Sequence, residues 1–457
     1  MRRALFALLL AALPFAPQAA EPALRAALVA DGFSAPIFAE PGPGGALLVG
    51  EQTGLVWRLA PDGARAGAPF LDLRDRLSPL LPAFDERGLW SLALHPNFPR
   101  DGRVFVTYAA KRREGSPWTG STAHTWRLSE FPATSEAVDT ARERVLIEID
   151  WINRKHNGGG LAFGADGMLY VGVGDGGGVH GVPEVWTPPP ADSSRPKGDP
   201  IAEDPFRLLA EFHHYDSWAQ DMSRLHGKIL RIDVDARPDP GLAYAVPPDN
   251  PFVGEASARA EIWAWGFRNP FRIAVDGQSG GLFVNGVAET LWETIFRVNE
   301  PGNYGWAAKE GTHCFDRARA FDPPATCARE DALGFAYRDP VVEYANWAAG
   351  LPIAKVEAKP LGSANVGGMI YRGAAIPALR GALVFGDFSA RIAEPSGLVL
   401  VAWPLADRTW PVEPLLELDQ RLHSLGVDAE GEILLLTTAQ GVPVGETGKL
   451  WRLVPAD

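Results

Sequence analysis

Short apolar segments alternate with turns rich in Gly, Asp and Asn along most of the chain. Two such segments flanking one turn predict a β-hairpin. The segments pair as 46–50 with 54–58, 92–96 with 103–107, 161–163 with 168–173, 272–276 with 281–285, 368–372 with 382–386, and 425–428 with 432–436. The pattern therefore predicts an all-β fold.

The recurrence of these hairpins indicates how the fold is organised. Repeats of about 40–50 residues with four short strands each are typical of a β-propeller. The spacing is irregular, so we expect long loops between strands. We count six blades, and five or seven also fit the pattern. The last apolar segment, residues 449–454, resembles residues 56–59, which suits a ring closed by the two ends of the chain.

The first twenty residues have the pattern of an export signal. Arg2 and Arg3 precede an apolar run, residues 4–12, and the segment ends in Ala19 and Ala20. A buried N-terminal helix is the alternative. We expect a signal peptide over 1–20, a single propeller domain over 21–457, and a location in the periplasm or outside the cell. No later stretch is apolar for long enough to span a membrane.

The longest irregular stretch is an insertion at about 178–221. A loop of this length is usually functional or disordered. Because it leaves directly from the hairpin that follows His156, one hypothesis is a lid over that hairpin. The alternative is a surface insertion without a role in function.

Charge and cysteine content narrow the possible partners. The formal net charge is -13, and no Lys/Arg-rich run is present, which argues against nucleic acid or anionic membranes as partners. The charge fits a protein that handles a neutral or cationic small molecule. Cys314 and Cys327 are the two cysteines, and an even pair closing a short loop in an exported chain predicts one disulfide.

Two literal motif matches lack the context that gives them meaning. Residues 172–177 satisfy GxGxxG, but prolines rather than a helix follow them, so a dinucleotide site is not indicated. Residues 277–281 satisfy GxSxG, but they lie in a hairpin turn instead of a strand-to-helix elbow.

The strongest candidate for catalysis is His156, which stands beside Asn157 and three glycines. A histidine in a Gly-rich loop is poorly placed for core packing, and imidazole can take a proton near neutral pH. A second polar site is Arg268-Asn269, which ends a strand at the expected mouth of the propeller. The guanidinium fork of arginine matches carboxylates and carbonyl oxygens.

A third polar site is the Gly-rich turn that follows Asn285. Glu289 and Glu293 lie in or near this turn. Carbonyl and carboxylate oxygens are the ligands that a hard cation such as calcium prefers. The turn is therefore a candidate metal site, although its spacing is not that of an EF-hand.

Seven motifs occur in one order along the chain. They are Glu86-Arg87-Gly88-Leu89 with Leu92 to Phe98, His156-Asn157-Gly158-Gly159, Gly174-Asp175-Gly176-Gly177, His226 to Asp233, Trp265 to Pro270, Asn303 to Trp306, and Glu310 to Cys314. Together they resemble the soluble glucose/sorbosone dehydrogenase family, the PQQ-dependent sugar dehydrogenases. The likeness covers nearly the whole chain, from about Leu24 to Val454.

The resemblance implies a six-bladed propeller that binds pyrroloquinoline quinone (PQQ) and calcium on its upper face. It implies that His156 removes the proton of the sugar C1 hydroxyl as hydride passes to C5 of PQQ. Arg268 then contacts the quinone oxygens, where a fixed cation stabilises developing charge. Further residues are implied as cofactor contacts (Glu86, Asn269), carbonyl ligands of the calcium at PQQ (Gly286, Val287) and ligands of a second calcium (Glu293, Tyr304).

The chain departs from the family pattern on the side that binds the PQQ carboxylates. The family's lysine is absent at about the position of Ser389, and Arg391, two residues on, offers the same charge. An arginine pair near the C-terminus is reduced to Arg421 and His423. We therefore expect Arg391 and Arg421 to contact the cofactor.

These observations predict a PQQ- and calcium-dependent dehydrogenase in the periplasm. It would oxidise an aldose-type sugar at C1 to the lactone and pass electrons to an acceptor such as a cytochrome or a quinone. Two alternatives stay open: a non-catalytic extracellular propeller that binds a partner, and a calcium-dependent lactone or ester hydrolase on the same fold.

Overall fold

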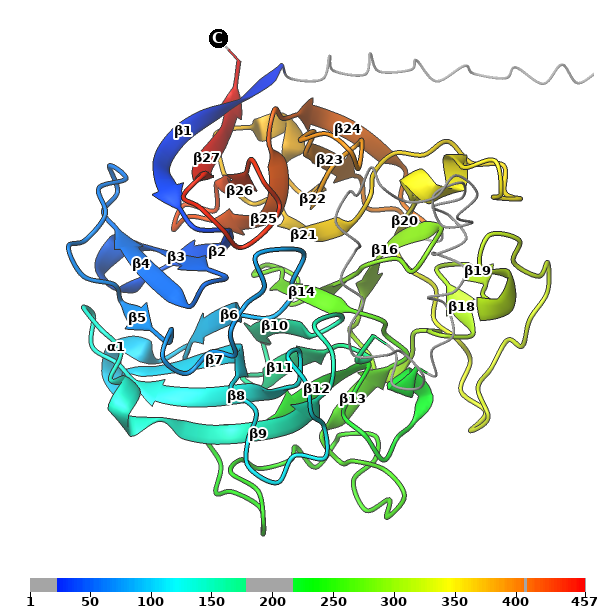
Figure 1. Cartoon of the computed structure of the whole chain (residues 1–457), viewed down its shortest axis with the longest axis horizontal. Helices are drawn as coiled ribbons and strands as arrows, with labels where there is room; N and C mark the ends of the chain where they lie inside the picture. Colours follow the sequence, from blue (N-terminus) through cyan, green and yellow to red (C-terminus); the bar gives the residue numbers. More distant parts are fainter. Residues whose placement is uncertain (1–22, 178–216, 407–408, 457) are drawn as a thin grey trace, which may run out of the picture.

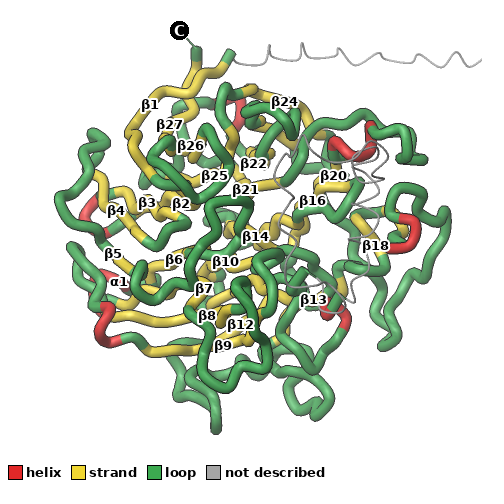
Figure 2. The backbone as a smooth tube through the Cα atoms, in the orientation of Figure 1, coloured by secondary structure: helices red, strands yellow, loops and turns green. Residues whose placement is uncertain are grey.

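The protein folds into a ring of six sheets (Figure 1). The computed structural model describes residues 23–177, 217–406 and 409–456. The predicted signal peptide and most of the predicted insertion lie outside the described residues. Helices are short and peripheral (Figure 2), comprising α1 (Phe98–Asp101) and a few 3-10 turns. Among the described residues, no helix is long and apolar enough to cross a bilayer.

Each sheet forms one blade, with its innermost strand given first. The blades are β2 (Pro36–Pro41), β3 (Leu47–Glu51), β4 (Leu55–Leu59) and β5 (Leu71–Asp72); β6 (Leu89–Leu94), β7 (Arg103–Ala110), β8 (His124–Pro132) and β9 (Arg144–Trp151); β10 (Gly158–Phe163), β11 (Leu169–Val173), β12 (Lys228–Ile232) and β13 (Ile262–Trp265); β14 (Pro270–Val275), β15 (Leu282–Gly286), β16 (Trp292–Arg297) and β20 (Val342–Ala345); β21 (Asn365–Ile370), β22 (Leu383–Asp387), β23 (Leu398–Ala402) and β24 (Val412–Glu417); and β25 (Arg421–Val427), β26 (Ile433–Thr438), β27 (Gly448–Pro455) and β1 (Leu24–Phe33). The short β17 (Gly302–Asn303) adds to the third sheet in parallel with β13.

The six-bladed all-β prediction is confirmed. All six predicted hairpins are antiparallel strand pairs. The first strand, β1, pairs with the last, β27, so both ends of the chain complete one blade. Closure through a shared blade removes the open sheet edges that the ends would otherwise leave.

The hydrophobic core lies between neighbouring blades. The middle strands β11, β12 and β22 are buried along their whole length, because each sheet is covered by one neighbouring blade on each face. One core cluster joins Trp90 and Trp126 of the second blade to Leu161 and Trp265 of the third. Strands buried on both faces have continuous apolar runs rather than alternation, which is the pattern found in the sequence.

Arg272 of β14 occupies the centre of the ring. Its guanidinium donates to Ser424 Oγ (2.9 Å), to the Trp90 carbonyl (3.0 Å) and to the Ile37 carbonyl. These partners belong to three other blades. Burial lowers the pKa of Arg272 to about 9, against the opposing effect of the Glu40 charge. One side chain thus ties four inner strands together at the axis.

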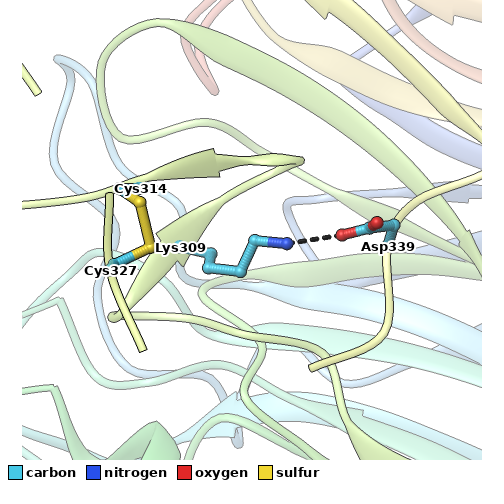
Figure 3. Close-up of a disulfide and its surroundings, with 4 residues drawn as sticks. All are labelled: Lys309, Cys314, Cys327 and Asp339. Carbon is cyan, nitrogen blue, oxygen red and sulfur yellow. Dashed lines mark hydrogen bonds and ion pairs between the residues drawn. A yellow bond between two sulfur atoms is a disulfide. The ribbon is translucent and has the colours of Figure 1, made fainter. Parts of the chain in front are cut away.

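A disulfide joins Cys314 and Cys327, as the sequence predicted (Figure 3). Cys314 lies in β19 (His313–Cys314), which pairs with β18 (Lys309–Glu310). On the same hairpin Lys309 forms an ion pair with Asp339. The disulfide therefore holds the hairpin that carries Glu310, a residue of the site described below.

The blade topology brings distant residues to one face. The innermost strands β2, β6, β10, β14, β21 and β25 lie side by side around the axis. The second strand of each blade is antiparallel to the first, so the beginning of every first strand and the end of every second strand lie on the same face. The functional residues occur at these two kinds of position.

Candidate active site

His156 lies immediately before β10 in a strained turn. Its φ is 51°, in the left-handed region that non-glycine residues rarely adopt. A Cβ on Gly174 would lie 1.7 Å from the His156 carbonyl oxygen, so glycine is required there for this close approach. Backbone strain of this kind is a reason to look for function at the residue.

The ring of His156 is oriented by Asp175, which follows β11. His156 Nδ1 lies 2.7 Å from Asp175 Oδ1. Asp175 Oδ2 accepts hydrogen bonds from Trp306 Nε1 (2.7 Å) and Ser217 Oγ (3.0 Å). Because a carboxylate accepts, Nδ1 carries the proton and Nε2 is left to accept one.

Asp175 is held as a carboxylate. Burial raises its pKa, but His156, the charge of Arg268 and the N–H of Gly177 outweigh burial, so the pKa of Asp175 lies below its usual value. An ionised carboxylate stabilises the imidazolium that forms when His156 takes a proton.

Glu86 and Asn269 approach the same turn from two other blades. Glu86 Oε2 accepts the backbone N–H of His156 at 2.6 Å, and Asn269 Oδ1 accepts the N–H of Gly158 at 2.8 Å. The Gln52 amide donates to the carbonyls on either side of Glu86, at 2.5 and 2.8 Å. These bonds fix the position of the His156 turn relative to three blades.

Arg268 lies just before β14 and is mostly buried, with 13% of its side chain exposed. Its Nε donates to Glu289 Oε2 at 2.5 Å and its Nη1 donates to the Val287 carbonyl at 3.1 Å. Its own carbonyl accepts the N–H of Asp175 at 2.8 Å. Burial acts to lower the pKa of Arg268, but the charges of Glu289, Asp175 and Glu86 raise it overall, so the guanidinium stays charged.

Two buried carboxylates hold the loop between β15 and β16. Glu293 accepts the N–H of Ala288 at 3.1 Å. Glu310 accepts the next three N–H groups along the loop, those of residues 289 to 291, at 2.7, 2.7 and 3.0 Å. Burial raises the pKa of Glu310 to about 7, although the bound N–H groups lower it. With its N–H groups engaged on one side, the loop presents the Val287 carbonyl and the Glu289 carboxylate to Arg268 on the other.

The predicted calcium ligands fall into two groups. Gly286 and Val287 line a cavity of about 30 Å³ that also borders Arg268 and Glu289. Glu293 is engaged elsewhere, with Ala288, Asn346 and Asn365. The Tyr304 hydroxyl donates to the Glu300 carbonyl. Among the described residues, nothing brings Glu293 and Tyr304 together, and no group of three or more His, Cys, Asp or Glu side chains is arranged to hold a metal.

A comparison with known families identifies the family of the chain. The family model described as Glucose / Sorbosone dehydrogenase matches residues 33–198 and 209–450. The chain belongs to the glucose/sorbosone dehydrogenase family.

Two curated proteins similar to this chain have names that point to different functions. Mouse Hedgehog-interacting protein is 26% identical over 421 residues, which are 89% of this chain and 49% of that protein. Aldose sugar dehydrogenase YliI of Escherichia coli is 27% identical over 224 residues, 49% of this chain and 47% of that protein. The chain spans about half the length of the curated relatives it matches.

Solved structures share the fold of this family member. A glucose dehydrogenase is 20% identical with a TM-score of 0.63, covering 95% of this chain and 100% of that one. The PQQ-bound form of an aldose sugar dehydrogenase from Streptomyces coelicolor is 19% identical with a TM-score of 0.58, covering 95% and 99%. At these identities the likeness establishes the propeller fold alone.

The two arginines predicted to contact the cofactor, Arg391 and Arg421, differ in their surroundings. Arg391 is exposed and forms ion pairs with Glu394 and Glu417, not with the other predicted site residues. Ser389, where the family's lysine was expected, is fully buried, and its hydroxyl bonds to nearby backbone and serine oxygens. Arg421 begins β25 and lies over the Phe388 ring, and its buried Nη1 has no hydrogen-bond partner in the described parts of the chain.

Three residues of the site received no role from the sequence. In the sequence, Asp175 was noted only as part of a Gly-Asp-Gly-Gly motif. Its position just after the second strand of a blade is the feature from which a role at the site could have been predicted. Glu310 was likewise visible only within a motif. Lys155 precedes His156, and among the described residues no ion-pair partner contacts its ammonium group. Burial lowers the pKa of Lys155, while the nearby charges of Glu86 and Glu289 raise it.

Proposed function

We propose that this family member is a PQQ- and calcium-dependent dehydrogenase that oxidises an aldose-type sugar at C1 to the lactone. The observation that carries the proposal is the His156–Asp175 pair beside the mostly buried, charged Arg268. A surface that only binds a partner has no need for a base oriented by a carboxylate next to a fixed guanidinium.

The proposed reaction removes a proton and a hydride from the sugar. His156 Nε2 takes the proton of the C1 hydroxyl, and the C1–H bond breaks as the second C–O bond forms. Asp175 stabilises the resulting imidazolium through the bond to Nδ1. When bound, PQQ supplies the quinone that accepts the hydride. Arg268 would supply a positive charge that stabilises the negative charge developing on that acceptor.

The residues present suit the charges of PQQ, which carries carboxylates. Among the described residues, neither the Lys155 ammonium group nor the Arg421 guanidinium forms an ion pair with a carboxylate, and we infer that both pair with the cofactor's carboxylates. Arg391 is already paired with two glutamates, and we assign it a lesser part. For calcium, the carbonyls of Gly286 and Val287 and the Glu289 carboxylate are donors of the type this ion prefers. The second calcium, at Glu293 and Tyr304, stays a prediction.

The test is to titrate the calcium-loaded protein with PQQ, following the cofactor's absorbance, and then to add a panel of aldoses with an artificial acceptor. Tight binding and sugar-dependent reduction are expected. His156→Ala should lower turnover by about 10²–10⁴-fold while leaving PQQ binding intact. His95→Ala, which changes a histidine that contacts Asp101 and Asp235 rather than the His156 turn, is the matched control. Full activity in His156→Ala would refute its role as the base.

The second candidate is a binding module, favoured by the likeness to Hedgehog-interacting protein over 89% of this chain. Absence of PQQ binding in the titration would favour it. The electron acceptor, a cytochrome or a quinone, and an exported location also belong to this proposal. The disulfide supports export, because such bonds persist in oxidising compartments.

A further inference from the structure

The buried Asp175 carboxylate is surrounded by four hydrogen-bonding partners. Its Oδ1 lies 2.7 Å from His156 Nδ1 and accepts the N–H of Gly177 at 2.9 Å. Its Oδ2 accepts from Trp306 Nε1 at 2.7 Å and from Ser217 Oγ at 3.0 Å. An ionised carboxylate has about four lone-pair sites, so protein groups fill its accepting capacity.

The two groups on Oδ2 can act only as donors. The indole N–H of Trp306 has no accepting atom. Ser217 precedes the 3-10 turn η3 (Trp218–Gln220), and its Oγ accepts the N–H of Ala219 at 3.2 Å. The single proton of the Ser217 hydroxyl is therefore directed to Asp175. Both groups place positive dipoles on the side of the carboxylate opposite His156.

Both donors are held in place by packing that serves no other purpose at the site. The Trp306 ring packs against Phe315, with ring centroids 4.6 Å apart. The buried ammonium group of Lys228 in β12 donates to the carbonyls of Trp218 and Ala219, at 3.0 and 2.9 Å, and so fixes η3. The sequence motifs that contain Lys228 and Trp306 thus meet at one carboxylate.

We propose that Trp306 and Ser217 are positioning residues that set the proton affinity of His156 by acting through Asp175. Donors on Oδ2 stabilise negative charge on the far side of the carboxylate, so less of that charge stabilises the imidazolium. Without these donors, the His156–Asp175 pair would hold its proton more tightly. The inference deepens the proposed function and rests on it only for the use of His156 as a base.

Other titratable groups also face this pair. Burial lowers the pKa of His226 to about 3, so its ring is neutral. Burial lowers the pKa of Lys228 to about 7, against the charges of Asp221 and Asp175. The remaining charged groups lie around the His156 turn and are Glu86, Lys155 and Arg268. None of them changes in the variants below, so a difference from the wild type reports the lost donor.

The experiment is an NMR pH titration of protein with isotope-labelled histidine, without PQQ or sugar. The His156 signal is assigned by its loss in His156→Ala. Trp306→Phe removes the indole N–H and keeps an aromatic ring against Phe315. The pH at which half of His156 is protonated should rise by about 0.5–1 pH unit in this variant, as expected when a charge-assisted hydrogen bond to its counter-ion is lost.

Two more variants fix the sign of the effect. Ser217→Ala should move the titration of His156 in the same direction by a smaller amount, because the bond it removes is longer. Asp175→Asn should move it to lower pH, because the anion that stabilises the imidazolium is lost.

Trp410→Phe is the matched control for replacing an indole by a phenyl ring. Trp410 is also buried, and its Nε1 donates to the Leu405 carbonyl at 3.0 Å. It belongs to a core cluster between the fourth and fifth blades. Its replacement should leave the titration of His156 unchanged.

Two results would overturn the inference: an unchanged or lower half-protonation pH in the Trp306 and Ser217 variants, and an equal rise in Trp410→Phe. If Trp306→Phe does not fold, Ser217→Ala decides alone. Failure of the proposed function gives a different result, because the shifts would persist in a protein that never oxidises a sugar. In an active dehydrogenase, the acid limb of kcat/KM should move to higher pH by the same amount.

Discussion

Replacing Glu310 by glutamine tests the carboxylate clamp that presents the candidate metal loop. Glu310 is buried, and its pKa is raised from the usual 4.5 to about 7, chiefly by burial. A carboxyl group whose folded pKa is raised contributes stability that is complete below pH 4.5 and is lost as the pH rises through 7. The difference between 4.5 and about 7 corresponds to about 3 kcal/mol in total.

The glutamine variant cannot ionise, so it lacks this pH-dependent contribution. Between pH 5 and pH 8 the wild type should lose about 2.5 kcal/mol relative to Glu310→Gln. For a chain of 457 residues, 1 kcal/mol moves the thermal midpoint by roughly 1 °C. The midpoint of the variant, whatever its offset at pH 5, should therefore rise by about 2–3 °C relative to the wild type at pH 8.

The assay is thermal unfolding at several pH values, followed by circular dichroism. Glu432→Gln is a suitable control, because Glu432 also accepts consecutive backbone N–H groups, those of Ala374 and Ala375. Burial acts to raise the pKa of Glu432, but its hydrogen bonds lower it overall. The stability it contributes is present throughout pH 5–8 and lost only at lower pH, so this variant should show a constant deficit. Parallel curves for the wild type and Glu310→Gln would refute the reasoning.

Three further predictions concern the active site and the disulfide. Asp175→Asn should lower kcat/KM by about 10–100-fold, because a charge-assisted hydrogen bond to His156 is worth roughly 1.5–3 kcal/mol. The affinity for PQQ should be nearly unchanged. Steady-state kinetics and a PQQ titration check both expectations, and unaltered kinetics would contradict the first. Lys155→Met should weaken PQQ binding about 3–10-fold and reduce its dependence on salt, and an unchanged affinity at low salt would exclude an ion pair to the cofactor. Reduction of the Cys314–Cys327 disulfide should lower the thermal midpoint by about 3 °C, since closing a loop of this length contributes roughly 3 kcal/mol; an identical midpoint with and without reductant would contradict this.

Local sequence was sufficient to predict the repeating unit of the fold. An apolar run, a turn and a second apolar run make hairpin pairing a nearest-neighbour event, and all six predicted pairs are present. The innermost strand of the first blade, β2, was missed. It begins and ends with proline, at Pro36 and Pro41, and has no alternating pattern. The predicted pair 46–50 with 54–58 is consequently the second and third strand of its blade, whereas the other pairs are the first and second.

Candidate site residues could be selected from the sequence where one residue carries its own signal. His156 was selected from its Gly-rich loop, and Arg268-Asn269 from the strand end before Pro270, and the roles of these residues stay predictions. The partners that give these residues their chemistry were not predictable in this way. Glu86 and His156 are 70 residues apart, and Gly158 and Asn269 are 111 apart; only closure of the ring brings them together.

The sequence by itself therefore determined the blade unit, the disulfide and the candidate base, because each depends on interactions between nearby residues. The tertiary structure alone decided the electrostatics. It paired Arg391 with surface carboxylates, left the Lys155 ammonium group without an ion-pair partner among the described residues, and placed Arg268 on the oxygens of Val287 and Glu289. Which charged groups form pairs depends on the order of the blades around the axis and on burial. The spacing of residues along the sequence determines neither.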